Sequence, residues 1–186
     1  MPRALDVLVA LVALIVTAPI TLAVALAVRV TSPGPVLYWS DRVGRGSRLF
    51  RMPKFRTMRV GTPVVATDRL QDPRRHLTPI GAFLRKLSLD ELPQLWCVLV
   101  GDMSLVGPRP ALFNQHELID ARRATGIDRL RPGITGWAQV NGRDEISDER
   151  KVQLDAEYLR GRSPAMDARI LFLTVRRVVS ADGVSH

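Results

Sequence analysis

Residues 7–28, "VLVALVALIVTAPITLAVALAV", carry no charge and form a stretch long enough to span a lipid bilayer as a helix. Pro19 lies near the middle of this stretch, where a proline removes one backbone hydrogen bond and clashes with the preceding turn. We therefore expect a kink at Pro19. Because lipid offers no hydrogen bonds, we expect the hydroxyl of Thr17 or Thr21 to satisfy the backbone groups that the kink frees.

Positive charges flank the apolar stretch on both sides. Arg3 precedes it, and four arginines follow it: Arg29, Arg42, Arg45 and Arg48. Charge near both ends suits a helix that enters and leaves the membrane on the cytoplasmic side. We therefore predict a re-entrant membrane helix over residues 1–30, broken at Pro19, and a cytoplasmic domain over residues 31–186. A one-pass anchor is the alternative; a secretory signal fits less well, because no cleavage site clearly ends the run.

Composition limits the classes of partner. The chain has 186 residues, the size of one domain, and its 27 Lys and Arg against 18 Asp and Glu leave a net charge of +9. This excess predicts an anionic partner: a nucleic acid, a phospholipid surface or a phosphorylated substrate. Cys97 is the single cysteine, so an internal disulfide is excluded. The histidines are scattered, which argues against zinc, and no P-loop, dinucleotide fingerprint or serine hydrolase elbow appears.

The part after the apolar stretch is predicted to be α+β and mainly helical. Residues 36–43 and 47–52 flank Gly44-Arg45-Gly46 and predict a short β-hairpin. Apolar periodicity predicts helices over residues 79–88, 89–100, 113–125, 147–160 and 166–180. The second of these helices is expected to start irregularly, because Pro93 comes late for a first-turn proline. Three segments are predicted as loops or connectors: residues 60–76, 101–110 and 131–143.

The last predicted helix, "MDARILFLTVRRVVS" over residues 166–180, has a broad apolar face and a basic pair at Arg176 and Arg177. Such an amphipathic helix is suited to lie at a membrane interface against anionic headgroups. Packing of the same stripe against the protein core is the alternative. The predicted fold is thus one re-entrant helix, one small hairpin and amphipathic helices at the membrane interface.

Two carboxylates, Asp90 and Glu91, stand side by side in this basic chain. With Ser88 they fit a capping box, in which Ser88 and Glu91 cap the start of a helix. Another interpretation assigns chemistry to the pair: the helix N-terminus keeps Asp90 ionised, and the guanidinium groups of Arg85 and Arg109 match phosphate oxygens. A carboxylate in that setting can bind a divalent cation or attack phosphorus. Both interpretations stay open, since Glu91 can cap while Asp90 points outward.

Four segments, in order behind the apolar stretch, make the chain similar to a known family: "SPGPVLYWSDRVGRGSRLFRMPKFRTM", "LTPIGAFLRKLSLDELPQLW", "GDMSLVGPRP" and "RPGITGWAQVNGR". They resemble the bacterial sugar transferase family, the small monotopic phosphoglycosyl transferases. The resemblance implies an enzyme of the bacterial inner membrane, with its catalytic domain on the cytoplasmic face. It also implies transfer of a sugar 1-phosphate from a UDP-sugar to polyprenyl (undecaprenyl) phosphate with release of UMP, the first membrane step of surface glycan assembly, as in exopolysaccharide biosynthesis. The chain looks like the minimal form of the family, without an extra N-terminal membrane bundle.

The resemblance also assigns roles to residues. It implies that Asp90 is the nucleophile, which becomes a covalent phosphosugar-aspartate, that Glu91 is its catalytic partner, and that Mg²⁺ lies at Asp90. The phosphate- and substrate-binding residues that it implies are Arg85, Arg109, Lys54, Arg56, Gly136, Gln139 and Arg143. For Lys54 and Arg56, binding to the membrane surface is the alternative.

The chain departs from the family pattern at three places. Ala18 precedes Pro19 where serine is frequent, Asp144-Glu145-Ile146 follow "NGR" where asparagine and then an aromatic residue are usual, and Cys97 stands where asparagine is common. The second departure leaves sugar recognition open, and we expect only a packing role for Cys97. The sequence also leaves open the identity of the UDP-sugar, the polyprenol length, the glycan pathway and whether the chain forms a homo-oligomer.

Two other function classes compete with the transferase. A membrane-anchored binder of nucleic acid or another anionic polymer needs a basic helix or a patch of interleaved aromatic residues. The arginines here are spread out and aromatic residues are few, so we expect no nucleic-acid partner. A non-catalytic membrane scaffold has no need for an acidic pair beside an arginine, and would tolerate Asp90→Asn.

Overall fold

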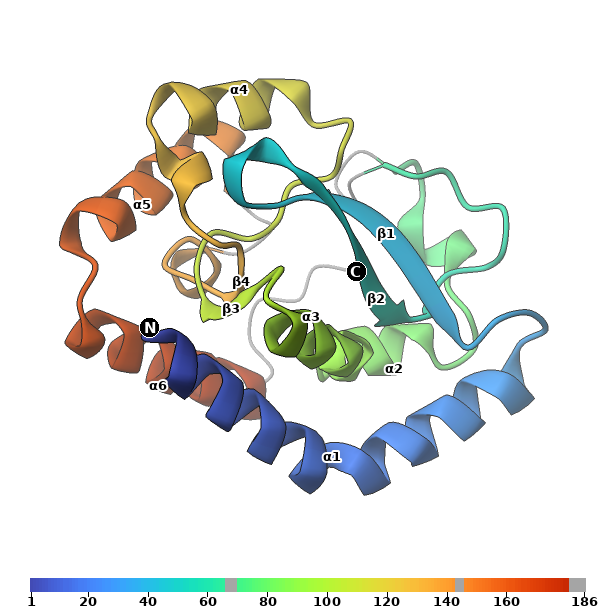
Figure 1. Ribbon diagram of the computed structural model, residues 1–186. Coiled ribbons are helices and arrows are strands. Elements are labelled where there is room, and N and C mark those ends of the chain that lie inside the picture. Colours follow the sequence, from blue (N-terminus) through green and yellow to red (C-terminus); the bar gives the residue numbers. More distant parts are fainter. Residues whose placement is uncertain (66–69, 143–145, 181–186) are drawn as a thin grey trace.

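The computed structural model describes residues 1–65, 70–142 and 146–180. Helix α1 (Arg3–Thr31) runs along one edge of the molecule and bends near its middle, where Pro19 lies in the sequence (Figure 1). The predicted kink is therefore confirmed. Its predicted compensation is wrong: the Thr17 hydroxyl donates to Ala13 O at 2.7 Å, and the Thr21 hydroxyl is buried without a hydrogen-bond partner in the described chain. Pro19 has no amide proton to donate to the carbonyl of Ile15, four residues earlier. A threonine hydroxyl in a helix also reaches the carbonyl four residues earlier, so neither Thr17 nor Thr21 donates to the Ile15 carbonyl.

One narrow face of α1 packs on the rest of the protein. Ala10, Val24 and Val28 are buried, whereas most of the other large apolar side chains of this helix are exposed. The helix is long and apolar enough to cross a membrane. Ala10 lies in the same core cluster as Val98 of α3 (Leu95–Val100), so α1 shares its core with the helices that follow.

Polar contacts fix the first turns of α1 to the body of the protein. Asp6 is buried and its carboxylate accepts from Ser104 Oγ at 2.8 Å and from the Leu105 amide at 3.0 Å. The Arg3 guanidinium donates to the carbonyls of Val98 and Leu99 at the C-terminal end of α3. Helix ends leave such carbonyls without intrahelical donors, and the negative end of the helix dipole favours a cation. Arg3 is therefore a packing residue as well as a flanking charge.

The predicted hairpin is confirmed. β1 (Leu37–Val43) pairs with β2 (Leu49–Phe55) in an antiparallel register that sets Leu37 opposite Phe55 and Val43 opposite Leu49. The hairpin lies beyond α3 as seen from α1 (Figure 1).

The five predicted helices form; the first three are shorter than predicted, and the last two nearly match their predicted bounds. They are α2 (Gly81–Lys86), α3, α4 (His116–Ala124), α5 (Asp148–Gly161) and α6 (Pro164–Ser180). The irregular start expected around Pro93 is confirmed, because α3 is preceded by the 3₁₀ helix η4 (Leu89–Gln94), which contains that proline. Short 3₁₀ turns complete the chain: η1 (Arg45–Ser47), η3 (Pro73–His76), η5 (Ile127–Arg129) and η6 (Gln139–Asn141).

A second, parallel strand pair lies where the sequence predicted only connector and loop. β3 (Ser104–Val106) pairs with β4 (Gly133–Thr135), with Ser104 opposite Gly133 and Val106 opposite Thr135. A Cβ atom on Gly133 would collide with the backbone of Gly107, so glycine allows the two segments to approach. Strands of three residues between glycines and prolines show no alternation, which is why the pattern concealed them.

Cys97 is expected to resist alkylation in the folded protein. Its side chain is 1% exposed, and burial raises the pKa of the thiol to about 11. At pH 8 roughly one thiol in a thousand is then the reactive thiolate. Iodoacetamide at pH 8, followed by mass spectrometry, should leave Cys97 unmodified in the native protein and modify it fully in denaturant. Rapid modification of the native protein would contradict the packing role.

Candidate active site

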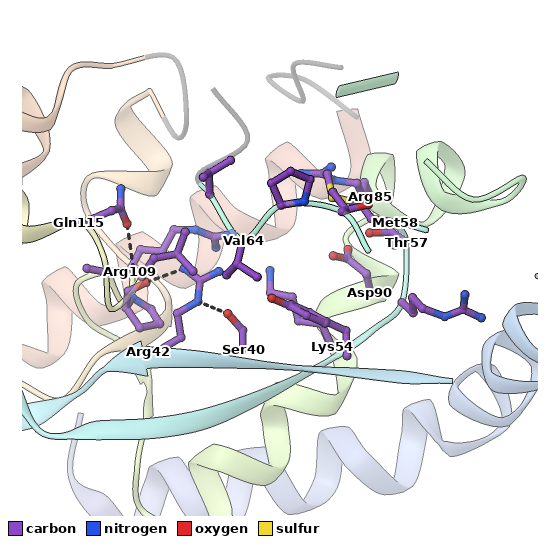
Figure 2. Close-up of a pocket in the computed structure, with 18 of the residues that line it drawn as sticks. Ser40, Arg42, Lys54, Thr57, Met58, Val64, Arg85, Asp90, Arg109 and Gln115 are labelled. Carbon is purple, nitrogen blue, oxygen red and sulfur yellow. Dashed lines mark hydrogen bonds between the residues drawn. The ribbon is translucent and has the colours of Figure 1, made fainter. Parts of the chain in front are cut away.

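A cavity of about 490 Å³ lies between the hairpin, the segment after β2, η4 and the start of α4. Asp90, Lys54 and Arg85 lie on one side of it, and Ser40, Arg42 and Gln115 on the other (Figure 2). Arg109 and Lys151 also line the cavity, so most of the charged side chains in its wall are cations. The charge of the wall predicts an anionic ligand.

Asp90 and Glu91 are neighbours in the chain but line different spaces. Successive residues of a 3₁₀ helix project about 120° apart, so adjacent side chains in η4 diverge. Asp90 lines the large cavity, whereas Glu91 lines a neighbouring cavity of about 210 Å³. Glu91 Oε1 accepts from Lys54 Nζ at 2.8 Å and from Arg109 Nη2 at 2.9 Å. The structure therefore brings Lys54, Glu91 and Arg109 together from three separate elements.

The capping box does not form. Ser88 has a left-handed backbone conformation with φ of 55°, and its side chain makes no capping hydrogen bond. The Ser88 amide donates to Arg85 O at 3.0 Å and not to the Glu91 carboxylate. A capping box needs an extended residue at the first position, and the two cations hold Glu91 elsewhere. The helix-cap interpretation of the acidic pair is therefore wrong.

Burial and the surrounding cations give the two carboxylates opposite pKa shifts. For Glu91, burial alone would raise the pKa, but Arg109 and Lys54 outweigh it and hold the pKa well below its usual range. For Asp90, burial raises the pKa above its usual value, and Lys54 offsets only part of this effect. The Asp90 carboxylate has no hydrogen-bond donor or ion-pair partner among the residues that the structure describes. Asp90 is thus a buried carboxylate that lines the cavity, a setting typical of reactive groups.

Burial and the charge of Glu91 have opposite effects on the pKa of Lys54. Burial lowers the pKa of its ammonium group, and the negative charge of Glu91 acts in the opposite direction. The ion pair with Glu91 therefore favours a protonated Lys54 beside Asp90.

The family model for bacterial sugar transferases matches residues 1–181, from α1 through α6. The chain belongs to the bacterial sugar transferase family. The resemblance drawn from the four sequence segments is thereby confirmed.

Members of the family with known names are similar over almost the whole chain. The UDP-glucose:undecaprenyl-phosphate glucose-1-phosphate transferase of Escherichia coli K12 is 41% identical, over 93% of this chain and 39% of that protein. An undecaprenyl-phosphate N-acetylgalactosaminephosphotransferase of Aeromonas hydrophila is 37% identical, over 97% of this chain and 44% of that protein. The exopolysaccharide production protein ExoY of Rhizobium meliloti is 39% identical, over 97% of this chain and 86% of that protein. The chain thus spans less than half the length of the first two relatives.

Arg56 is predicted to bind substrate and lies in the wall of the cavity. Its guanidinium, however, donates hydrogen bonds to backbone carbonyls. Its Nε donates to Pro35 O at 2.6 Å, Nη1 to Pro33 O at 2.8 Å and Nη2 to Ser32 O at 3.0 Å. The side chain is 5% exposed. In this member of the sugar transferase family, Arg56 fastens the turn that joins α1 to β1.

Arg56→Lys should therefore lower stability more than substrate binding. An ammonium group cannot reproduce the guanidinium fork that serves carbonyls of three residues, so we expect unfolding to become easier by about 2 kcal/mol. The KM for the donor substrate should stay within about twofold, because backbone carbonyls already occupy the three nitrogens of the guanidinium. Thermal unfolding and steady-state kinetics, with the exposed Arg48→Lys as control, measure both quantities. A large rise in KM at unchanged stability would restore the substrate-binding role.

The remaining predicted residues fall into three groups. Gln139 lines both cavities; its Nε2 donates to Ile134 O at 3.3 Å, and its Oε1 is buried without a partner in the described chain. Gly136 does not line the large cavity, and a Cβ atom there would collide with the Gly107 carbonyl, so this glycine permits close packing. Arg143, like Asp144 and Glu145, lies outside the described residues.

Sequence reasoning missed the far side of the cavity, formed by Ser40, Arg42, Gln115 and Lys151. The sequence indicates Arg42 only as a charge that follows the apolar stretch. The hairpin register is the signal that could have revealed it. Tyr38, Ser40 and Arg42 are every second residue of β1, and Tyr38 pairs directly with Lys54 of β2. Directly paired residues and alternate residues share one face of an antiparallel pair. Arg42 therefore faces the same way as Lys54.

Proposed function

We propose that this chain transfers a sugar 1-phosphate from a UDP-sugar to polyprenyl phosphate and releases UMP. The observation that carries the proposal is the placement of Asp90: a buried carboxylate that faces a cavity lined by Lys54, Arg85 and Arg109. The named relatives support it, since they act on UDP-sugars and undecaprenyl phosphate. The relatives differ in the sugar they transfer, so the donor sugar stays open.

In the first step, an oxygen of the Asp90 carboxylate forms a bond to the β-phosphorus of the UDP-sugar. The bond from that phosphorus to the bridging oxygen breaks, and UMP leaves with the electron pair. Arg85, Arg109 and Lys54 stabilise the negative charge on the phosphate oxygens. The product is a sugar phosphate joined to Asp90.

In the second step, a phosphate oxygen of the polyprenyl phosphate attacks the same phosphorus and the bond to Asp90 breaks. Attacking and leaving oxygens lie in line on opposite sides of phosphorus. UMP leaves opposite Asp90, so the lipid phosphate must arrive opposite Asp90 as well. Both substrates therefore use the large cavity in turn, which implies ping-pong kinetics.

Glu91 acts as the partner of Asp90 in this proposal. Its charge holds Lys54 and Arg109 beside the reacting phosphate, and it stays ionised because those cations keep its pKa low. This role is electrostatic and positional, and it requires no proton transfer by Glu91.

Mg²⁺ fits the site if the substrate phosphates and the protein bind the ion together. The described residues contain no group of three His, Cys, Asp or Glu side chains that could hold a metal by themselves. Magnesium is commonly held by one or two carboxylates together with phosphate oxygens, and Asp90 offers such a carboxylate. The ion, when bound, would neutralise charge on the diphosphate.

We also propose that α1 is re-entrant and that the domain lies on the cytoplasmic face of the inner membrane. The bend near the middle of α1, a helix that contains Pro19, and the exposed apolar side chains of this helix support this placement (Figure 1). The apolar stripe of α6 is compatible both with core packing and with a membrane interface. Ile170 is fully buried in the core, while Phe172 and Val175 are exposed. Exposed Trp96 of α3 adds to the apolar surface that an interfacial position would cover.

Labelling of single cysteines tests the topology of α1. Cysteines placed at Ala4 and Thr31, both exposed, should share one side of the membrane if the helix is re-entrant. A membrane-impermeant maleimide added outside intact spheroplasts should then label neither position, and should label both after lysis. Labelling of one position alone before lysis would establish a one-pass anchor.

UMP release tests the activity. The purified chain in nanodiscs, with Mg²⁺ and polyprenyl phosphate, is offered a panel of UDP-sugars. UMP from one or two donors, lost when EDTA removes the metal, is the expected result. Release of UDP would indicate ordinary glycosyl transfer, and no nucleotide from any donor would favour the scaffold.

A further inference from the structure

We propose that Arg122 and Asp155 are positioning residues that hold Arg109 in place for the transfer reaction. This inference rests on the proposed function. Neither residue carries a role in the sequence interpretation, and both lie on helices, α4 and α5, that follow the catalytic segment in the chain.

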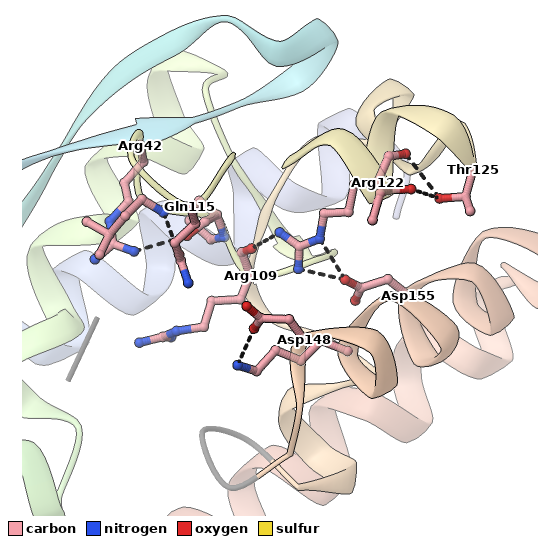
Figure 3. A network of polar contacts seen from close by, with 11 residues as sticks. Arg42, Arg109, Gln115, Arg122, Thr125, Asp148 and Asp155 are labelled. Atoms are coloured by element: carbon pink, nitrogen blue, oxygen red, sulfur yellow. Dashed lines mark hydrogen bonds and ion pairs between the residues drawn. The ribbon is translucent and has the colours of Figure 1, made fainter. Parts of the chain in front are cut away.

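The pair is buried and joined to the backbone of Arg109. Arg122 donates from Nε and Nη2 to Asp155 Oδ2, at 3.0 Å and 2.6 Å, and from Nη1 to Arg109 O at 2.7 Å (Figure 3). Asp155 is 1% exposed and Arg122 is 8% exposed. The Arg109 side chain in turn donates to Glu91. A continuous chain of contacts therefore runs from α5 to the carboxylate pair in η4.

The segment around Arg109 has few backbone donors of its own with which to fix its position. Pro108 and Pro110 flank it, and neither proline can donate a backbone hydrogen bond. The segment is held instead through its carbonyls: Pro108 O accepts from the Gly133 amide at 2.9 Å, and Pro110 O accepts from Arg42 Nη1 at 3.1 Å. Arg122 holds the carbonyl between these two, which belongs to the residue that contacts Glu91.

Stability alone is a weak reason for this ion pair. Removing two charges from water offsets much of their attraction, and buried ion pairs can often be replaced by apolar side chains without loss of stability. Asp155 Oδ1 is buried without a partner in the described chain, so the burial of this carboxylate is not fully compensated. The geometry that the pair imposes on Arg109 supplies a functional reason for it.

The double variant Arg122→Met with Asp155→Leu tests the inference, because it removes both charges and the donor to Arg109 O together. We expect kcat for UMP release to fall about tenfold or more, since small displacements of a catalytic contact are costly. The KM for the UDP-sugar should change by less than about threefold. Asp155→Asn, which keeps the side-chain shape, should change kcat in the same direction by a smaller factor.

A double-mutant cycle separates positioning from general damage. If the pair acts through Arg109, adding the double variant to Arg109→Ala should lower the remaining rate by less than about twofold. Tyr158→Phe is the matched control: it removes a buried hydrogen bond from α5 to Asp167 that does not lead to Arg109. This control should keep kcat within about twofold in both backgrounds.

The outcomes are distinct. An unchanged kcat in the double variant overturns the inference, and so does an equal loss in the wild-type and Arg109→Ala backgrounds. A wild-type protein that releases no UMP from any donor overturns the proposed function, and the inference with it. An active wild type with insensitive variants overturns the inference alone.

Discussion

Asp90→Asn should lower the rate of UMP release by at least about 10⁴-fold, because the amide oxygen cannot act as a nucleophile toward phosphorus. The carboxylate faces the cavity without a donor among the described residues, so its loss breaks no hydrogen bond within the fold. The variant should therefore keep the thermal stability of the wild type and its association with nanodiscs. Steady-state UMP release and thermal unfolding measure the two effects separately.

The covalent intermediate offers a second measurement for Asp90. Wild-type protein incubated with the UDP-sugar but without polyprenyl phosphate should gain the mass of one sugar phosphate, on the peptide that contains Asp90. The matched control is Asp102→Asn, which makes the same chemical change at an exposed aspartate outside the large cavity. This control should form the adduct at the wild-type rate. Full turnover by Asp90→Asn would refute the proposed mechanism and favour the scaffold interpretation.

Glu91→Gln should lower the rate by about 10²- to 10³-fold, a smaller loss than at Asp90, because Glu91 acts through the cations that it holds. Its removal leaves Lys54 and Arg109 facing a neutral amide. Burial already lowers the pKa of Lys54, and Glu91 is the largest influence in the opposite direction. Without Glu91, Lys54 loses its proton more readily and the positive charge beside the reacting phosphate weakens.

Kinetics and stability distinguish this role from simple unfolding. Removing one partner of a buried ion pair also destabilises a protein by about 3–5 kcal/mol, so the rate is measured below the unfolding temperature of the variant. Glu117→Gln, at an exposed position in the first turn of α4, is the control and should behave as wild type. A Glu91→Gln protein with wild-type kcat would show that the Lys54–Glu91–Arg109 contacts are structural only.

Local patterns predicted much of this fold. The kink in α1 follows from one proline in an apolar helix, and the hairpin follows from alternating β-branched and aromatic residues around Gly44-Arg45-Gly46. Each of these signals lies within a few residues of the structure it specifies. The β3–β4 pair lacked such a signal, because three-residue strands are defined by their partner and not by their own periodicity.

The sequence by itself determined the long apolar helix with its kink, the hairpin, the family and the acidic pair, since these depend on neighbouring residues and on ordered motifs. Only the tertiary structure decided how the charges are used. Arg56 and Arg109, alike in sequence as arginines near the site, differ because one meets the carbonyls of a turn and the other meets Glu91. The partner of a charge is chosen by long-range packing: Lys54 lies 37 residues from Glu91, and Arg122 lies 33 from Asp155. Such distances in the chain carry no periodic signal, so the fold alone joins these groups.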